Sequence, residues 1–223
     1  MLEPLRSLWR WFRQPVSGLS HLAAALLSAV GLVWLLRLVA ASGAEARLAP
    51  LAIFGGSMVL LFTASALYHL LPVSERSVAR LRKLDHSAIF VFIAGSYTPV
   101  CLLVLQGKKG LLLTVAIWAA ALLGVLMKLV SVGTSRWLRV GPYLLMGWMA
   151  LLALPDLWAK LPGAGFAWLA AEGLIYSLGA VVYAAKWPDP LPERFGFHEV
   201  WHLFVIGGSF CHFWLVAQYV LPA

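Results

Sequence analysis

Phe197-His198-Glu199-Val200-Trp201-His202 begins the last long apolar segment of this chain of 223 residues. On an α-helix, His198 and His202 lie four residues apart and therefore share one face, one turn above the other. That spacing lets two imidazole groups reach a single metal ion. Ionisable groups at membrane depth are costly and usually face the interior of a bundle or water. The fold is therefore expected to bring other polar residues to this pair.

The composition is that of a protein built to sit in lipid. Hydrophobic residues make up 62% of the chain and charged residues only 12%, whereas soluble domains carry about 25% charged residues. The 11 tryptophans fit two interfacial belts. The net charge of +8 indicates loops that face the cytoplasm. No basic stripe interleaved with aromatic residues lies outside the apolar segments, so nucleic acid is not an expected partner.

Seven segments are long enough to cross about 30 Å of hydrocarbon. We place them at 18–41, 48–70, 84–105, 110–131, 138–155, 166–186 and 197–221. The connections are short, and neither a linker nor a repeat is visible. The sequence thus predicts an all-α integral membrane protein, with residues 17–223 as a single seven-helix transmembrane domain. Residues 1–16 combine apolar residues at helical spacing with a separate row of arginines, which predicts an amphipathic interfacial segment and not a signal peptide.

Lys and Arg in the connecting segments predict the orientation. One side carries eleven of them: Arg6, Arg10, Arg13, Arg76, Arg80, Arg82, Lys83, Arg136, Arg139, Lys186 and Arg194. The other side carries four: Arg47, Lys108, Lys109 and Lys160. Because the more positive side faces the cytoplasm, we expect a cytoplasmic N-terminus and an outside C-terminus in the plasma (inner) membrane.

This orientation gathers polar residues at the cytoplasmic ends of distant spans. His69 ends the second span, Asp85 and His86 begin the third, and His198 and His202 begin the seventh. We favour His69, His198 and His202 as metal ligands. Three neutral imidazoles and one water make an open site for Zn²⁺, which is the cofactor that we expect.

Two residues are predicted to act beside these ligands. Asp85 is the candidate general base, or the hydrogen-bond acceptor for a ligand. Ser65 lies one turn deeper than His69 on the same helix face and is placed to hydrogen-bond a water or a substrate carbonyl. Asp85 and His86 point about 100° apart on a helix, so we expect only one of them at the ion. Asp85 is preferred because three neutral ligands need a nearby anion, and His86 is the alternative.

Other ionisable residues are expected outside the metal site. His212 lies about 15 Å beyond His202 along a helix, which predicts a packed, hydrogen-bonded histidine. Glu172 lies inside the sixth span, where it must pair or be neutral; a role in proton transfer is the alternative. The stretch also matches the His-Glu-x-x-His motif of soluble zinc proteases, but no acidic residue follows His202 as a third ligand. Glu199 is therefore expected to face the loop or to cap the first helical turn.

Several motifs together resemble the haemolysin III family, the bacterial branch of the progestin and adiponectin receptor-like proteins. They are Ser17-Gly18-Leu19-Ser20-His21, the Ser65-x-x-x-His69 motif, 84–90 (LDHSAIF), 94–99 (AGSYTP) and 197–202 (FHEVWH). The resemblance implies seven helices and an intramembrane zinc. It also implies ligands that fall on His69, His198 and His202, with the superfamily's aspartate on Asp85.

The resemblance leads to three expectations of function. The first is a zinc-dependent hydrolase of membrane-embedded lipid amides, by analogy with the ceramidase-like activity proposed for the superfamily. The second, implied by the family name, is a pore-forming cytolysin. The third is a non-enzymatic regulator of membrane properties in which zinc is structural. Membrane lipids are the expected partners, and the sequence gives no indication of the oligomeric state.

Overall fold

The computed structural model describes residues 11–130, 136–192 and 195–221. In this part of the chain, seven helical segments are long and apolar enough to cross a membrane. They are Pro15–Ser42, Glu45–Leu70, Glu75–Leu105, Gly107–Val130, Val140–Lys160, Gly163–Ala185 and Phe197–Val220. The predicted all-α bundle of seven spans is confirmed. The N-terminal ten residues lie outside the described part, so the interfacial segment at 1–16 stays a prediction.

The long helices give each span its main element. They are α2 (Pro15–Ser42), α3 (Leu48–Leu70), α4 (Glu75–Pro99), α5 (Gly107–Val130), α6 (Arg136–Gly147), α7 (Leu154–Lys160), α8 (Gly163–Ala185) and α9 (Phe197–Leu215). Short irregular turns complete them: the 3₁₀ turns η1 (Glu45–Arg47) and η3 (Trp148–Ala153), and the π-helical turns η2 (Val100–Leu105) and η4 (Val216–Val220).

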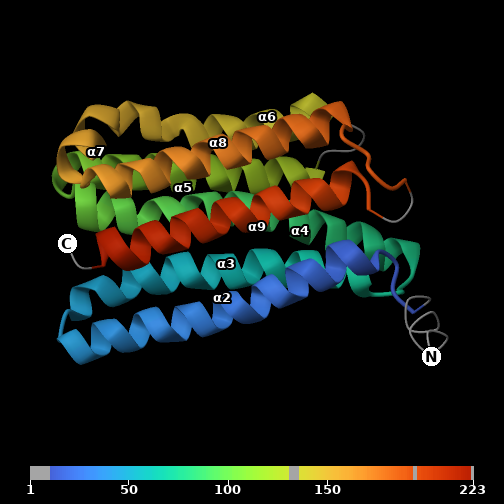
Figure 1. The fold of residues 1–223 in the computed structure, drawn as a ribbon, viewed down its shortest axis with the longest axis horizontal. Helices are drawn as coiled ribbons and strands as arrows, with labels where there is room; N and C mark the ends of the chain where they lie inside the picture. The colour runs from blue at the N-terminus through green and yellow to red at the C-terminus, as the bar shows by residue number, and fades with distance from the viewer. Residues whose placement is uncertain (1–10, 131–135, 193–194, 222–223) are drawn as a thin grey trace.

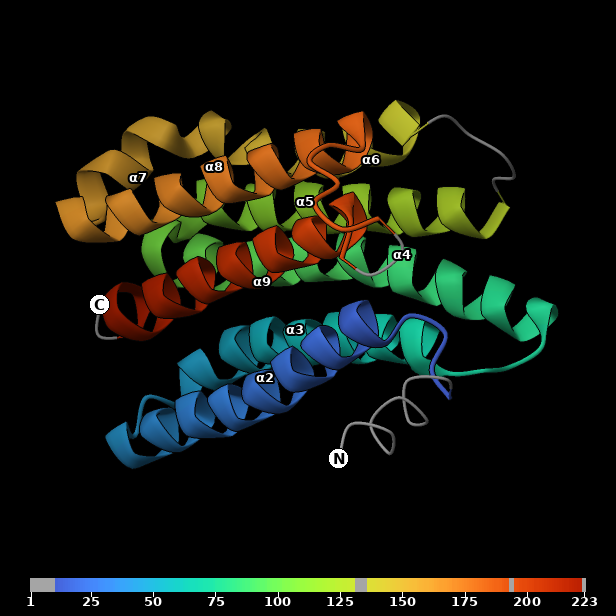
Figure 2. The same ribbon diagram turned by 45° about the vertical axis from the view of Figure 1, so that its right-hand side comes forward.

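The last helix occupies the middle of the bundle. Figures 1 and 2 both place α9 between α8 on one side and α2 and α3 on the other, and α9 contacts both α8 and α2. The start of α2 and the end of α9 lie at opposite ends of the bundle (Figure 1), as an odd number of spans requires. Which end faces the cytoplasm stays a prediction.

One predicted boundary is wrong by a wide margin. The third span was expected to start at residue 84, with Arg76 and its basic neighbours in a loop, but α4 begins at Glu75. The hydroxyl of Ser74 accepts a hydrogen bond from the Ser77 N–H and so caps the new N-terminus. Lys83 donates to the Leu129 carbonyl at 2.6 Å, at the end of α5. The basic residues therefore lie on a helix that extends beyond the apolar part of its span.

The fifth span, predicted at 138–155, consists of three pieces, and a side chain from α4 lies at the first break between them. The Tyr97 hydroxyl accepts from the Ala150 N–H at 2.8 Å. It donates to the Gly147 carbonyl at 2.6 Å, with the Met146 carbonyl at 3.0 Å. Tyr97 thus replaces a bond of the regular helical ladder, and α6 gives way to η3 at this point. The residues beyond the break continue the span to Lys160.

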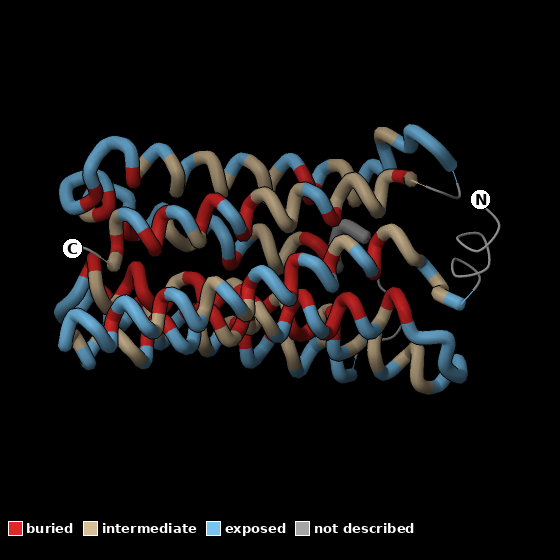
Figure 3. Tube along the Cα trace, turned by 60° about the horizontal axis from the view of Figure 1, so that its bottom comes forward, coloured by how far each residue is buried: buried red, intermediate tan, exposed pale blue. Residues whose placement is uncertain are grey.

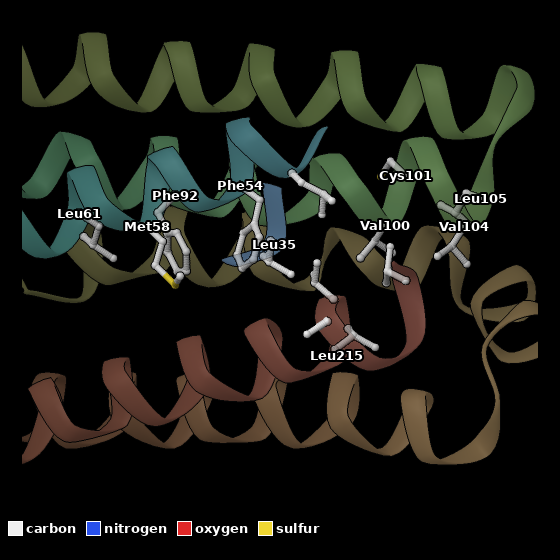
Figure 4. Packing of buried hydrophobic residues seen from close by; sticks show 14 of the residues in the cluster. Leu35, Phe54, Met58, Leu61, Phe92, Val100, Cys101, Val104, Leu105 and Leu215 are labelled. Carbon is white, nitrogen blue, oxygen red and sulfur yellow. The ribbon is translucent and has the colours of Figure 1, made fainter. Parts of the chain in front are cut away.

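Apolar side chains fill the space between α3, α4 and α9. Figure 4 shows Phe54 and Met58 of α3 beside Phe92 of α4, with Leu215 of α9 across the core. Along the tube in Figure 3, buried stretches alternate with exposed ones. Many of the exposed residues are large and apolar, such as Leu27 and Leu112. An apolar exterior of this kind suits contact with lipid and not with water.

Small residues let α2 and α4 each lie close to α3. A Cβ added at Gly18 would overlap the Leu70 side chain, and one added at Gly95 would overlap the Ser57 side chain. Gly56 faces open space, because an added Cβ would meet nothing within 4 Å. Close backbone approach at small residues is a common way to associate helices in membranes.

We predict that Gly95→Ala lowers the thermal stability of the detergent-solubilised protein, because overpacking costs about 1–3 kcal/mol. Gly56→Ala is the matched control and should leave the melting temperature unchanged or raise it, since Ala favours a helix by about 0.5–1 kcal/mol over Gly. Tryptophan fluorescence during a thermal ramp measures both. Equal melting temperatures for the two variants would contradict the close approach at Gly95.

Candidate metal centre and its cavity

Three histidines meet where α3 ends and α9 begins. His69 lies in the last turn of α3, and His198 and His202 lie in the first two turns of α9. One ring nitrogen of each lies within 4.8 Å of the others. His69 and His202 are each only 1% exposed. The structure thus brings together the three residues that spacing and depth predict as ligands, and the group could hold a metal ion.

The distance between two of these nitrogens fits metal ligation. Nε2 of His198 and Nε2 of His202 are 3.2 Å apart. Two lone pairs at this distance repel unless a proton or a cation lies between them. In a tetrahedral site with metal–nitrogen bonds of about 2.0–2.1 Å, two ligand nitrogens lie roughly 3.3–3.4 Å apart. With a third imidazole beside this pair, the donor set suits a metal that prefers nitrogen ligands.

Gln14 orients the third imidazole. Its side-chain Oε1 is hydrogen-bonded to Nδ1 of His69. Because an amide oxygen can only accept, Nδ1 of His69 carries the hydrogen and Nε2 keeps a lone pair. Ligating histidines commonly donate their other N–H to such an acceptor, which fixes the tautomer and the ring orientation. Gln14 therefore prepares Nε2 of His69 for a metal.

The segment that carries Gln14 is tied to the end of α3 by further contacts. The Gln14 N–H donates to the His69 carbonyl at 2.9 Å. The Arg13 guanidinium donates to the Tyr68 carbonyl and lies 5.2 Å from the centre of the Tyr68 ring. These contacts satisfy carbonyls that have no partner at a helix C-terminus. They also hold Gln14 next to His69.

Glu199 secures the start of α9, as the sequence predicts. Its Oε2 accepts from the Gly196 N–H at 2.9 Å, and its Oε1 accepts from the Ser17 hydroxyl at 2.7 Å. The first contact caps the helix, and the second joins α9 to α2. Both carboxylate oxygens are engaged in structural bonds. This arrangement does not suit the general base of a soluble zinc protease.

His21 covers the other side of the cluster. Its ring stacks on that of His202, with centroids 3.8 Å apart and planes inclined by 24°. Phe62 packs against the edge of His21, with ring centroids 5.1 Å apart. The stacked rings restrict rotation of His202 about its side-chain bonds, so α2 contributes to the site through packing.

A cavity of about 510 Å³ lies beside the histidines. His198 lines it together with Ser65 and Asp85, the two residues predicted to act on a substrate. Most of the remaining lining is apolar and comes from α3 to α9, for example Leu61, Phe92 and Val205. Cavities of roughly 300–1,000 Å³ with a few polar groups are typical of small-molecule sites.

Asp85 lies close to the cluster but not within it. Its carboxyl group interacts with the Ser65 hydroxyl and lies 4.0 Å from Nε2 of His86. Neither Asp85 nor His86 belongs to the group of ligand atoms found among the described residues. Both line the cavity, although neighbouring residues on a helix point about 100° apart. Their placement suits groups that meet a substrate.

Sequence reasoning missed Gln14 and the two contacts made by α2, those of Ser17 and His21. Each joins residues more than fifty positions apart, and no spacing pattern reports such contacts. The available signals were the position of Gln14 directly before Pro15 at the start of a span and the motif that runs from Ser17 to His21.

The other expectations for isolated polar residues are met. His212 is buried, and its Nδ1 lies 2.7 Å from Oε2 of Glu172, which pairs inside the bundle. Cys101 and Cys211 are free and buried, and free cysteines commonly pack as small apolar residues.

Comparisons with known proteins give a consistent result. The family model described as "Haemolysin-III related" matches residues 9–213. "Hemolysin-3 homolog" of Bacillus subtilis is 38% identical over 203 residues, which cover 91% of this chain and 92% of that protein. "Hemolysin-3" of Bacillus cereus is 34% identical over 226 residues, covering 100% of this chain and 99% of that protein. The "Adiponectin receptor protein" of Drosophila melanogaster is 28% identical over 183 residues, 73% of this chain and 40% of that protein.

We predict that purified protein binds about one zinc ion per chain and that His69→Ala and His202→Ala each lose it, because two imidazoles alone hold zinc weakly. His86→Ala is the control and should retain the metal. Elemental analysis of detergent-purified protein measures the content. Unchanged zinc in both ligand variants, or loss in His86→Ala, would show that the ligand set is wrong.

We also predict that Gln14→Leu weakens zinc affinity by about 10–100-fold, the usual effect of removing a partner of a ligating histidine. Gln14→Glu keeps an acceptor for Nδ1 of His69 and should preserve or increase the affinity. Competition with a chromogenic chelator measures both. If Gln14→Leu binds zinc as the unmodified protein does, then Gln14 does not orient the ligand.

Proposed function

Because the chain belongs to the haemolysin III family, we propose that it is a zinc-dependent hydrolase of membrane-embedded lipid amides. One observation carries this proposal. A three-histidine group adjoins a largely apolar cavity, and the same cavity is lined by a carboxyl group and a hydroxyl group, those of Asp85 and Ser65. An apolar cavity within membrane spans suits a lipid chain, and the polar groups gathered beside the histidines suit its headgroup.

The role of the three histidines, supported by Gln14, is to bind the metal ion. His69, His198 and His202 would hold the ion, with Gln14 orienting His69. Zinc, when bound, supplies a Lewis acid that polarises a carbonyl and makes water reactive near neutral pH. The apolar lining excludes bulk water, which strengthens electrostatic interactions inside the site.

Asp85 and Ser65 act on the substrate directly. The Asp85 carboxylate would accept a proton from the attacking water and return it to the leaving amine, as a general base and then a general acid. Once the Asp85 carboxyl group has taken the proton from water, it no longer needs the Ser65 hydrogen, and the Ser65 hydroxyl would donate it to the carbonyl oxygen as negative charge develops there. The contact between these two side chains keeps both directed at the same part of the cavity.

Seven apolar spans make the protein a multi-pass integral membrane protein. We place it in the plasma (inner) membrane, with the histidine end of the bundle at the cytoplasmic face. The basic residues on the first turns of α4 support this orientation. Its partners are then lipids of that membrane.

Two alternatives give different outcomes in the same experiments. A structural metal would stabilise the bundle without any turnover. Pore formation is suggested by the names of the two Bacillus relatives, but the mostly apolar lining of the cavity does not favour a path for water.

We predict that Asp85→Asn retains zinc and loses lipid-amide hydrolysis by about 10²–10⁴-fold, the usual contribution of a general base. Ser65→Ala should lose about 10²–10³-fold if the hydroxyl stabilises the oxyanion. The assay follows fatty-acid release from long-chain N-acyl amides by the protein reconstituted in liposomes, with zinc content measured on the same samples.

Ser87→Ala is a suitable control, because Ser87 is buried two residues from Asp85 and does not line the cavity. It should hydrolyse the amides as the unmodified protein does. An absence of turnover across a panel of lipid amides, with zinc fully bound and removal of zinc lowering the melting temperature, would instead favour a structural metal.

A further inference from the structure

A second polar cluster lies deep in the membrane between α8 and α9. Nδ1 of His212 and Oε2 of Glu172 are 2.7 Å apart. One turn away, the hydroxyls of Tyr176 and Ser209 are 3.0 Å apart. The His212 side chain is 3% exposed and that of Glu172 is 12% exposed. Ionisable residues at this depth are expensive and usually functional, and the proposed hydrolysis uses none of these four.

This cluster faces the same cavity as the metal centre. Glu172, Tyr176 and His212 all line it. If the pair served only to join α8 to α9, the carboxyl group would need no access to the cavity. Phe54 packs against the His212 ring on the α3 side, with centroids 5.0 Å apart. Nε2 of His212 has no partner among the described residues but is fully buried. Oε1 of Glu172 lies on the more exposed side chain of the pair, so it is the polar atom that a ligand can reach.

The distance along α9 from the candidate metal centre to His212 matches the length of one lipid chain. His212 lies ten residues after His202 on α9, which corresponds to about 15 Å along the helix axis. The hydrocarbon core of a bilayer is about 30 Å thick, so one leaflet contributes about half of it. A lipid with its headgroup at the histidines would therefore bring the far part of its acyl chain to Glu172.

The chemistry of Glu172 defines the group that it can bind. Oε2 is occupied by His212, and in the described part of the structure Oε1 makes no hydrogen bond. Whichever of the two side chains holds the shared proton, Oε1 remains an acceptor. Its ligand is therefore a hydrogen-bond donor. A neutral hydroxyl costs far less to bring to this depth than an ammonium ion.

We infer that Glu172, held by His212, forms a second binding subsite that takes a hydroxyl group near the far end of the acyl chain of the cavity lipid. The inference rests on the proposed function only in that a lipid chain occupies the cavity. It extends the substrate class to lipids with a hydroxylated chain. With bond lengths near 1.5 Å, an extended chain advances about 1.2–1.3 Å per bond, so about twelve carbons span the two sites.

The test compares three fatty acids as probes of the purified, zinc-loaded protein in nanodiscs. They are dodecanoic acid, ω-hydroxydodecanoic acid and β-hydroxydodecanoic acid, each titrated against a fluorescent fatty acid. The ω-hydroxy acid should bind about tenfold more tightly than dodecanoic acid, as expected for one hydrogen bond to a buried ionisable acceptor. The β-hydroxy acid should gain no affinity that depends on Glu172.

Glu172→Met keeps the size of the side chain and removes the carboxyl acceptor. It should abolish the preference for the ω-hydroxy acid while binding dodecanoic acid normally, which also shows that it is folded. Glu172→Leu serves as a second variant. Tyr176→Phe is the matched control, because it removes a neighbouring hydroxyl from the cavity lining and should keep the preference.

The failures can be told apart. Equal binding of the ω-hydroxy and plain acids to the unmodified protein, or a preference that survives Glu172→Met, would overturn the subsite alone. Binding of neither acid would overturn the subsite and also the lipid-filled cavity on which the proposed function depends. A fourth probe, ω-aminododecanoic acid, is titrated in the same way. If it binds more tightly than the ω-hydroxy acid, the assignment to a neutral hydroxyl is overturned.

Discussion

Two imidazole nitrogens 3.2 Å apart in a buried site need a proton or a cation between their lone pairs. This constraint governs the end of the bundle where α3 meets α9. His69 and His202 are almost fully buried, so water cannot separate the rings or satisfy their nitrogens. A metal ion held by His69, His198 and His202 would remove the repulsion between the lone pairs, and it would lie beside the cavity that His198 lines.

The surrounding structure keeps the imidazoles in place from several directions. Gln14 sets the tautomer of His69, His21 stacks on His202, and Glu199 connects the first turn of α9 to Ser17 of α2. The two helices that carry the three histidines are thus joined through a third helix, α2. Small residues such as Gly18 allow the backbones to lie close enough for these bonds.

The features that could be predicted from the sequence were those that depend on apolar runs and on the spacing of residues along a helix. Apolar runs gave five of the spans within three residues of their bounds, and helical spacing paired His198 with His202. His69 could be placed with them because span ends share a depth. The long start of α4 was not predictable from hydropathy, because its basic residues form a helix outside the apolar part of the span. Gln14 and Tyr97 act through contacts between distant segments, and these depend on packing that a single sequence does not display.

The hydroxyl of Tyr97 has a further consequence for the fifth span. It satisfies backbone groups at Gly147 and Ala150 that no regular helix would satisfy at this break. An unsatisfied backbone group in lipid costs several kcal/mol, so the broken form of the fifth segment is favourable only with the Tyr97 hydroxyl in place. The break in the fifth span therefore depends on its packing against α4.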